Sequence, residues 1–205
     1  MGITCMLRRV TERDLDRLLA GELDLGAMLS GPAPPPQPGG LRGFVSWLWK
    51  ASAEPGPAIA PPPPEPERED ELDLDKAWHG LHFLFTGLAE GGAAPGCFLL
   101  EGGEEIEEAG DDGPELDSPA RAFRPAEVRA IADFLDRLPP AELARRYDPA
   151  AMTRLRLYPD VIWTRPPRPG EELSPLEYLL DYAARLRGFV SQAAARGDGL
   201  LVWQG

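Results

Sequence analysis

The stretch LDLDKAWHGLHFLFTG, residues 72–87, decides the fold prediction because it joins an apolar helical face to both histidines of the chain. The residues of that face recur at helical spacing and are expected to point inward: Ala77, Leu81, Leu84, Phe85 and Leu88. The pattern predicts a helix over residues 76–88, with Asp73 or Asp75 as its N-cap.

Upstream of this helix, residues 2–10 form an apolar, strand-like opening. Thr11 can cap a short helix after it, and residues 23–29 can hold another turn or two. Downstream, the run CFLLE at 97–101 predicts a buried strand. Residues 101–117 then carry nine carboxylates, which is typical of a solvated acidic loop, since the ligand spacing of a known calcium loop is absent.

The second half of the chain is mostly helical. A short strand is expected at 121–123, followed by helices over about 125–138, 140–147 and 149–157 and an extended piece at 161–163. The sequence SPLE at 174–177 is a capping box with proline at the first helical position. It opens a long helix whose apolar stripe consists of Leu176, Leu179, Leu180, Ala183, Leu186, Phe189, Val190 and Ala193.

Residues 200–203 predict a last strand, which we expect to pair with the first strand near the centre of a sheet. The elements together predict one α+β (mixed α/β) domain over residues 1–205, with several helices around a small mixed sheet. Residues 31–71 are expected to be a proline-rich insert, because twelve of the 24 prolines fall between positions 31 and 70.

Within the insert, residues 41–50 predict a short apolar helix between two proline-rich arms. Such a helix can dock on its own domain, bind a partner or lie on a membrane surface, although Arg42 and Lys50 are its only basic residues for lipid headgroups. Its apolar side chains are the candidate interaction residues: Phe44, Val45, Trp47, Leu48 and Trp49.

The formal net charge of −13 disfavours nucleic acid as a partner, because a phosphate backbone would be repelled. No signal peptide is visible and no segment reaches the roughly 18 apolar residues that a membrane span needs. Cys5 and Cys97 lie far apart in the sequence without a metal-ligand spacing. These features predict a protein of the reducing cytoplasm.

Five stretches carry a resemblance to a known family: MGITCMLRRV at 1–10, LDLDKAWHGLHFLFTG at 72–87, FRPAEVRAIADFLDRL at 123–138, RYDPAAMTRLRLYPDVIW at 146–163 and AAARGDGLLVW at 193–203. In this order they resemble the YfbM-like family, a bacterial group of unknown function. The resemblance implies a single mixed α/β domain of bacterial origin, and it implies no activity, substrate or cofactor.

The two histidines are the best candidates for chemistry. Asp75, His79 and His82 share one face of the predicted helix, which is the minimum set for a weak metal site; the preferred expectation is no metal and no cofactor. Around the histidines we expect the candidate ligand-pocket residues Lys76, Trp78, Thr86, Tyr158 and Trp163. His79-Gly80 also resembles the His-Gly pair of ADP-ribosyltransferase-like folds, although in those folds the pair lies on a strand.

Two functions remain open from the sequence. The preferred one is an acidic protein-interaction module, immunity-like in that it could neutralise a basic partner such as a toxin. The alternative is an enzyme or a small-ligand or metal-binding protein that uses His79 and His82.

Overall fold

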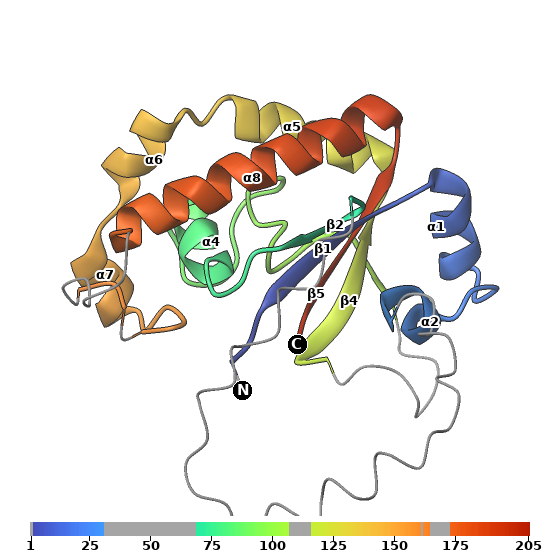
Figure 1. The fold of residues 1–205 in the computed structure, drawn as a ribbon, viewed down its shortest axis with the longest axis horizontal. Helices are drawn as coiled ribbons and strands as arrows, with labels where there is room; N and C mark the ends of the chain where they lie inside the picture. The colour runs from blue at the N-terminus through green and yellow to red at the C-terminus, as the bar shows by residue number, and fades with distance from the viewer. Residues whose placement is uncertain (1, 31–68, 107–115, 161, 165–172) are drawn as a thin grey trace, which may run out of the picture.

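The computed structural model of the chain describes residues 2–30, 69–106, 116–160, 162–164 and 173–205. A five-stranded sheet of order β2-β1-β5-β4-β3 lies between two groups of helices (Figure 1). This confirms the α+β class. The sequence predicted a small mixed sheet, and the four pairings among the described strands are all antiparallel.

The first and last strands, β1 (Cys5–Val10) and β5 (Gly199–Gln204), pair at the centre of the sheet, as predicted. Leu7 lies opposite Val202, and both side chains are fully buried. The strand β4 (Ser118–Phe123) pairs with the other edge of β5. The two ends of the chain are therefore joined by a ladder whose residues are almost the whole sequence apart.

One face of the sheet carries the main hydrophobic core, beneath α4 (Trp78–Thr86), α5 (Pro125–Asp136), α6 (Pro140–Arg146), α7 (Pro149–Arg154) and α8 (Pro175–Arg196). The opposite face carries a smaller core under α1 (Glu12–Leu19) and α2 (Leu25–Ser30) (Figure 1). As predicted, Thr11 caps α1 by accepting a hydrogen bond from the backbone N–H of Asp14.

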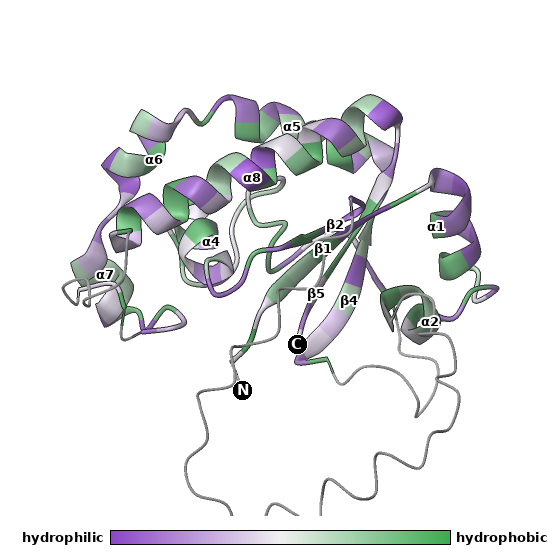
Figure 2. Ribbon diagram, viewed as in Figure 1, coloured by the Kyte–Doolittle hydropathy of each residue, from purple (hydrophilic) through white to green (hydrophobic). Residues whose placement is uncertain are grey.

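Helix α8 crosses the full width of the main core (Figure 1). Its predicted capping box is present, with Ser174 accepting from the backbone of Glu177, and Gly197 ends it in the left-handed conformation. Hydrophobic and hydrophilic residues alternate along its length, as a helix with one buried face requires (Figure 2). Each of its fully buried leucines, Leu179 and Leu186, contributes about 1.5–3 kcal/mol to folding.

Two edge strands escaped prediction, β2 (Glu71–Asp73) and β3 (Glu104–Ile106). Each has three residues, and most of them are charged, so neither shows the apolar alternation that identifies a half-buried strand. The segment expected to be an insert up to residue 71 thus ends in β2, and the segment expected to be an acidic loop begins with β3.

Other predictions around the candidate helix were wrong. Residues 97–101 form turns instead of a strand, although Cys97, Phe98 and Leu99 are buried. A short apolar run is compatible with a buried strand and with a buried turn, because its composition reflects burial and not the hydrogen-bonding pattern of the backbone. Leu88 lies beyond the end of α4 and is 49% exposed.

The start of α4 also differs from prediction. Ala77 is its N-cap and makes no side-chain capping bond, so neither Asp73 nor Asp75 caps the helix. Helix α7 ends at Arg154, before residue 157, and Ile162 and Trp163 lie in a bend and not in an extended piece. The remaining residue of that piece, Val161, lies outside the described residues.

The predicted apolar helix at 41–50 also lies outside the described residues, as do the interaction candidates Phe44, Val45, Trp47, Leu48 and Trp49. Within the described parts of the chain, none of the helices combines the length and the apolar character that crossing a membrane requires.

Candidate functional site

His79 is held on both sides of its ring by backbone groups. Its Nδ1 accepts a hydrogen bond of 2.9 Å from the N–H of Tyr158. Because Nδ1 accepts, the proton sits on Nε2, which donates to the carbonyl oxygen of Ala89 at 2.8 Å. Burial is the main cause that lowers the pKa of His79, so the ring is favoured in its neutral form. Both ring nitrogens of His79 are therefore hydrogen-bonded to the backbone.

Four of the predicted pocket residues lie together beside the start of β1. The ring of Trp78 stacks on His79, with 4.8 Å between centroids, and on Tyr158 at 5.6 Å. The indole Nε1 of Trp78 donates to the carbonyl of Ile3 at 3.3 Å. A Cβ atom added to Gly2 would lie 2.6 Å from the Tyr158 hydroxyl and 2.8 Å from Cε of Lys76. Trp78, His79 and Tyr158 therefore form one stacked group, and Lys76 lies with Tyr158 beside the N-terminal Gly2.

His82 lies on the inner side of α4 and is fully buried. Neither of its ring nitrogens has a hydrogen-bond partner among the described residues, although the Gly91 backbone lies close enough to raise its pKa. Burial outweighs that effect and, with His79, lowers the pKa to about 4. His82 is thus a neutral ring inside the core at physiological pH.

Thr86 and Trp163 do not join the stacked group. The Thr86 hydroxyl donates to the carbonyl of His82 at 2.8 Å and closes the last turn of α4. Trp163 is buried, donates to the carbonyl of Leu157 at 2.8 Å and covers Gly80. His79-Gly80 therefore lies in a helix, where the missing side chain of Gly80 makes room for an indole ring.

Asp75, the third weak metal candidate, binds a tyrosine on α8 instead. Its carboxylate accepts a hydrogen bond of 2.9 Å from the hydroxyl of Tyr178 on α8, and its own backbone has φ of 45°. Across the described residues, no group of three or more His, Cys, Asp or Glu side chains has an arrangement that could hold a metal ion.

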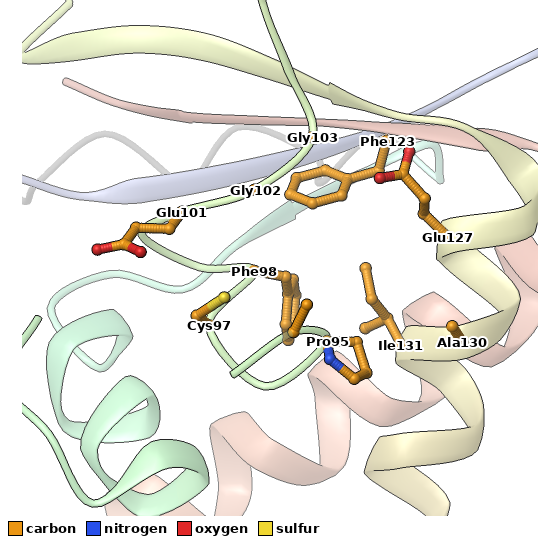
Figure 3. Close-up of a pocket in the computed structure, with 11 residues that line it drawn as sticks. Pro95, Cys97, Phe98, Glu101, Gly102, Gly103, Phe123, Glu127, Ala130 and Ile131 are labelled. Atoms are coloured by element: carbon orange, nitrogen blue, oxygen red, sulfur yellow. The ribbon is translucent and has the colours of Figure 1, made fainter. Parts of the chain in front are cut away.

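The structure contains an apolar pocket of about 330 Å³ that the sequence did not reveal (Figure 3). It lies between the loop that follows α4, the end of β4 and the exposed side of α5. Its lining residues are Ala94, Pro95, Cys97, Phe98, Glu101, Gly102, Gly103, Phe123, Glu127, Ala130 and Ile131. The two histidines are not among them.

The walls of this pocket are shaped by two aromatic rings and a pair of glycines. The rings of Phe98 and Phe123 meet edge to face at 6.4 Å and border the open space with Ile131 and Pro95 (Figure 3). Gly102 and Gly103 have positive φ, and a Cβ on Gly103 would approach the Ala122 carbonyl oxygen to 2.7 Å. The Gly-Gly pair after an apolar run was the one sequence signal for this close approach.

The charged side chains of the pocket lining are acidic. Glu101 and Glu127 belong to its lining, and Glu105 lies opposite Arg121 on the same face of the sheet; all three are exposed, and we call them the acidic rim. Glu104 lies opposite Ala122 on the other face and pairs with Arg124 at 3.7 Å, so it does not belong to the rim. Arg121 is a buried cation near the rim, and its guanidinium donates to the carbonyls of Phe98 at 3.0 Å and Leu99 at 2.7 Å.

A second hollow, of about 430 Å³, has a different character. It is lined by Arg8, Arg9, Val10, Thr11, Asp14, Met28, Asp70, Arg196 and Asp198. Arg8 pairs with Glu71, and Arg9 donates to the side chain of Gln192 at 3.1 Å. Three arginines and three aspartates balance one another here, so this hollow selects neither an anion nor a cation by net charge.

Comparison with known proteins agrees with the resemblance of the sequence to YfbM-like proteins. A protein of unknown function from Escherichia coli, YfbM, has a similar structure, with a TM-score of 0.58 over 98% of this chain and 99% of that chain at 16% identity. At that identity the likeness concerns the fold alone. No protein with curated annotation matches this chain. The family described as "Domain of unknown function (DUF1877)" matches residues 1–203, and the chain belongs to that family.

Proposed function

We propose that this protein is an acidic interaction module that binds a basic protein partner and neutralises it, as an immunity protein neutralises a toxin. The observation that carries the proposal is the acidic rim: three exposed carboxylates lie in or beside an apolar pocket, in a chain whose formal net charge is −13. Clustered charge of one sign attracts and orients a partner of the opposite sign.

The state of the histidines supports an interaction role over a catalytic one. A general acid or base needs a nitrogen within reach of substrate. Both nitrogens of His79 are bound to backbone groups, and His82 is fully buried. The free and buried state of Cys5 and Cys97 supports a cytoplasmic location, where thiols stay reduced.

The experiment is affinity capture from the host's own extract with the full chain, followed by titration of the purified partner at rising salt concentration. Binding should weaken steeply with salt, because the attraction between exposed charges is screened. The double variant Glu101→Lys with Glu105→Lys reverses charge on the acidic rim and should weaken binding at least tenfold.

The matched control is Glu12→Lys with Glu22→Lys, which makes the same change in net charge at the start of α1 and in the turn after it, on the opposite face of the sheet. It should leave most of the affinity intact. Failure to capture a basic partner, or binding that ignores both salt and the site of charge reversal, would reject the proposal.

A further inference from the structure

We infer that the apolar pocket beside the acidic rim receives one aromatic or aliphatic side chain from a lysine- or arginine-rich segment of the partner. This inference rests on the proposed function and adds the place and the chemistry of the contact. The volume of about 330 Å³ lies at the lower end of the range of ligand-binding pockets, so it suits one large side chain and not an extended segment.

The walls fit an apolar anchor. Phe98 and Ile131 are each only 1% exposed, so they form a rigid floor that the core holds in place. The lining residues that offer more accessible apolar surface are Ala94, Pro95 and Ala130. Interfaces draw most of their binding energy from such anchors, in which a large side chain enters a preformed pocket and leaves water. Each wall comes from a different element, and the packing of those elements holds the pocket open without a ligand.

The charges around the pocket indicate which residues should flank the inserted side chain in the partner. The lining contains two carboxylates, Glu101 and Glu127, and no Lys, Arg or His. Glu127 already accepts a hydrogen bond of 2.8 Å from the backbone of Arg124, which fixes its carboxylate at the rim. Glu101 points away from the space between Phe123 and Ile131 (Figure 3), so it can meet a cation beside the anchor and not within the pocket.

The guanidinium of Arg121 does not reverse this preference. It lies behind the pocket wall, 5.8 Å from the centre of the Phe123 ring, and its NH1 and NH2 groups are bound to two backbone carbonyls. An apolar side chain with cations on both sides therefore matches the site, whereas an acidic segment would face the three carboxylates of the acidic rim.

The test uses the full chain labelled with ¹⁵N and three pentapeptides, followed by NMR titration. The first probe has phenylalanine between two pairs of lysines. The second has alanine in place of phenylalanine, and the third has glutamates in place of the lysines. The first should bind about tenfold more tightly than the second, because burial of the ring contributes roughly 1.4 kcal/mol or more. Its shifts should centre on Gly102, Gly103, Ala130 and Ile131.

The variant Ala130→Trp fills the pocket from an exposed position of α5 and should abolish the preference for phenylalanine. Its control, Ala126→Trp, adds the same ring at another exposed position of α5 outside the pocket lining and should keep the preference. The residues whose NMR signals shift in the wild-type protein show where the peptide binds, independently of both variants.

The outcomes separate the two proposals. If both lysine peptides bind better than the glutamate peptide but equally to each other, the pocket inference is wrong and the acidic module stands. If the glutamate peptide binds as well as its lysine counterpart, the charge argument fails, and the proposed function fails with it. A preference for phenylalanine that survives Ala130→Trp would also overturn the inference that the pocket receives this side chain.

Discussion

The imidazole Nδ1 of His79 accepts a hydrogen bond of 2.9 Å from the backbone N–H of Tyr158, 79 residues further along the chain. This bond ties the first turn of α4 to the segment that follows α7. His79, which the sequence presents as a candidate for chemistry, thus has a structural role: its ring links two parts of the main chain through hydrogen bonds.

Replacement of His79 should loosen the segment at Tyr158. We expect His79→Leu to cost about 2 kcal/mol in the free energy of unfolding, because the partly buried Tyr158 N–H and Ala89 carbonyl lose their partner. Urea denaturation measures the loss. Hydrogen exchange should accelerate at the Tyr158 amide while the Leu7 amide in central β1 keeps its protection. Unchanged exchange at Tyr158 would show that the bond contributes nothing.

His82 should make the protein sensitive to mild acid. Its pKa falls from 6.5 in the unfolded chain to about 4 in the folded one. The unfolded state therefore takes up a proton first as the pH drops, so the stability that His82 contributes is complete above pH 6.5 and is lost between 6.5 and about 4. The loss is on the order of 3 kcal/mol at most. Thermal unfolding measured across this pH window gives the profile.

The variant His82→Leu provides the comparison for that profile. It removes two buried nitrogens that have no hydrogen-bond partner among the described residues, so it should keep or raise stability at neutral pH. It should also flatten the decline between pH 6.5 and 4. A profile as steep as that of wild type would assign the acid sensitivity to other groups.

Gly80 should tolerate no side chain, because its Cβ would lie 2.6 Å from Cη2 of Trp163 and 2.8 Å from Leu179. We expect Gly80→Ala to destabilise the protein by roughly 1–3 kcal/mol through overpacking. Gly188→Ala is the matched control within α8, where nothing lies within 4 Å of the added Cβ. That change should instead stabilise by about 0.5–1 kcal/mol, since alanine favours the helix. Opposite signs in chemical denaturation are the expected result.

Arg121 should hold the turn that forms one wall of the pocket. Its guanidinium binds the carbonyls of Phe98 and Leu99, and its side chain is buried. The variant Arg121→Met keeps the apolar stem and leaves two carbonyls unpaired, at an expected cost of about 2–4 kcal/mol. Denaturation and exchange at residues 97–101 measure the effect. Wild-type stability in this variant would mean that water replaces the guanidinium without loss.

Much of the fold was predictable because its signals are local. The capping box at Ser174, the N-cap at Thr11 and the apolar stripe of α8 each depend on residues within a few positions of one another. The central place of β1 and β5 also followed from two apolar terminal strands. The edge strands β2 and β3 escaped because each consists of three mostly charged residues held by a single neighbour.

The candidate site was less accessible to sequence reasoning. Lys76, Trp78, His79 and Tyr158 do lie together, yet their contacts are with one another and with the backbone near Ile3 and Ala89. The pocket between Phe98, Phe123 and Ile131 joins three segments that share no motif. Their meeting depends on the packing of α5 against the loop at 94–103, which no local pattern encodes.

The sequence by itself determined the family, the α+β class, the long helix α8 and the central strand pair, because periodicity and caps act over short distances. Only the tertiary structure decided that both nitrogens of His79 bind the backbone, that His82 is buried without a hydrogen-bond partner among the described residues, and that an acidic rim borders an apolar pocket. Each of these depends on which distant segments pack together, and packing is a property of the whole core.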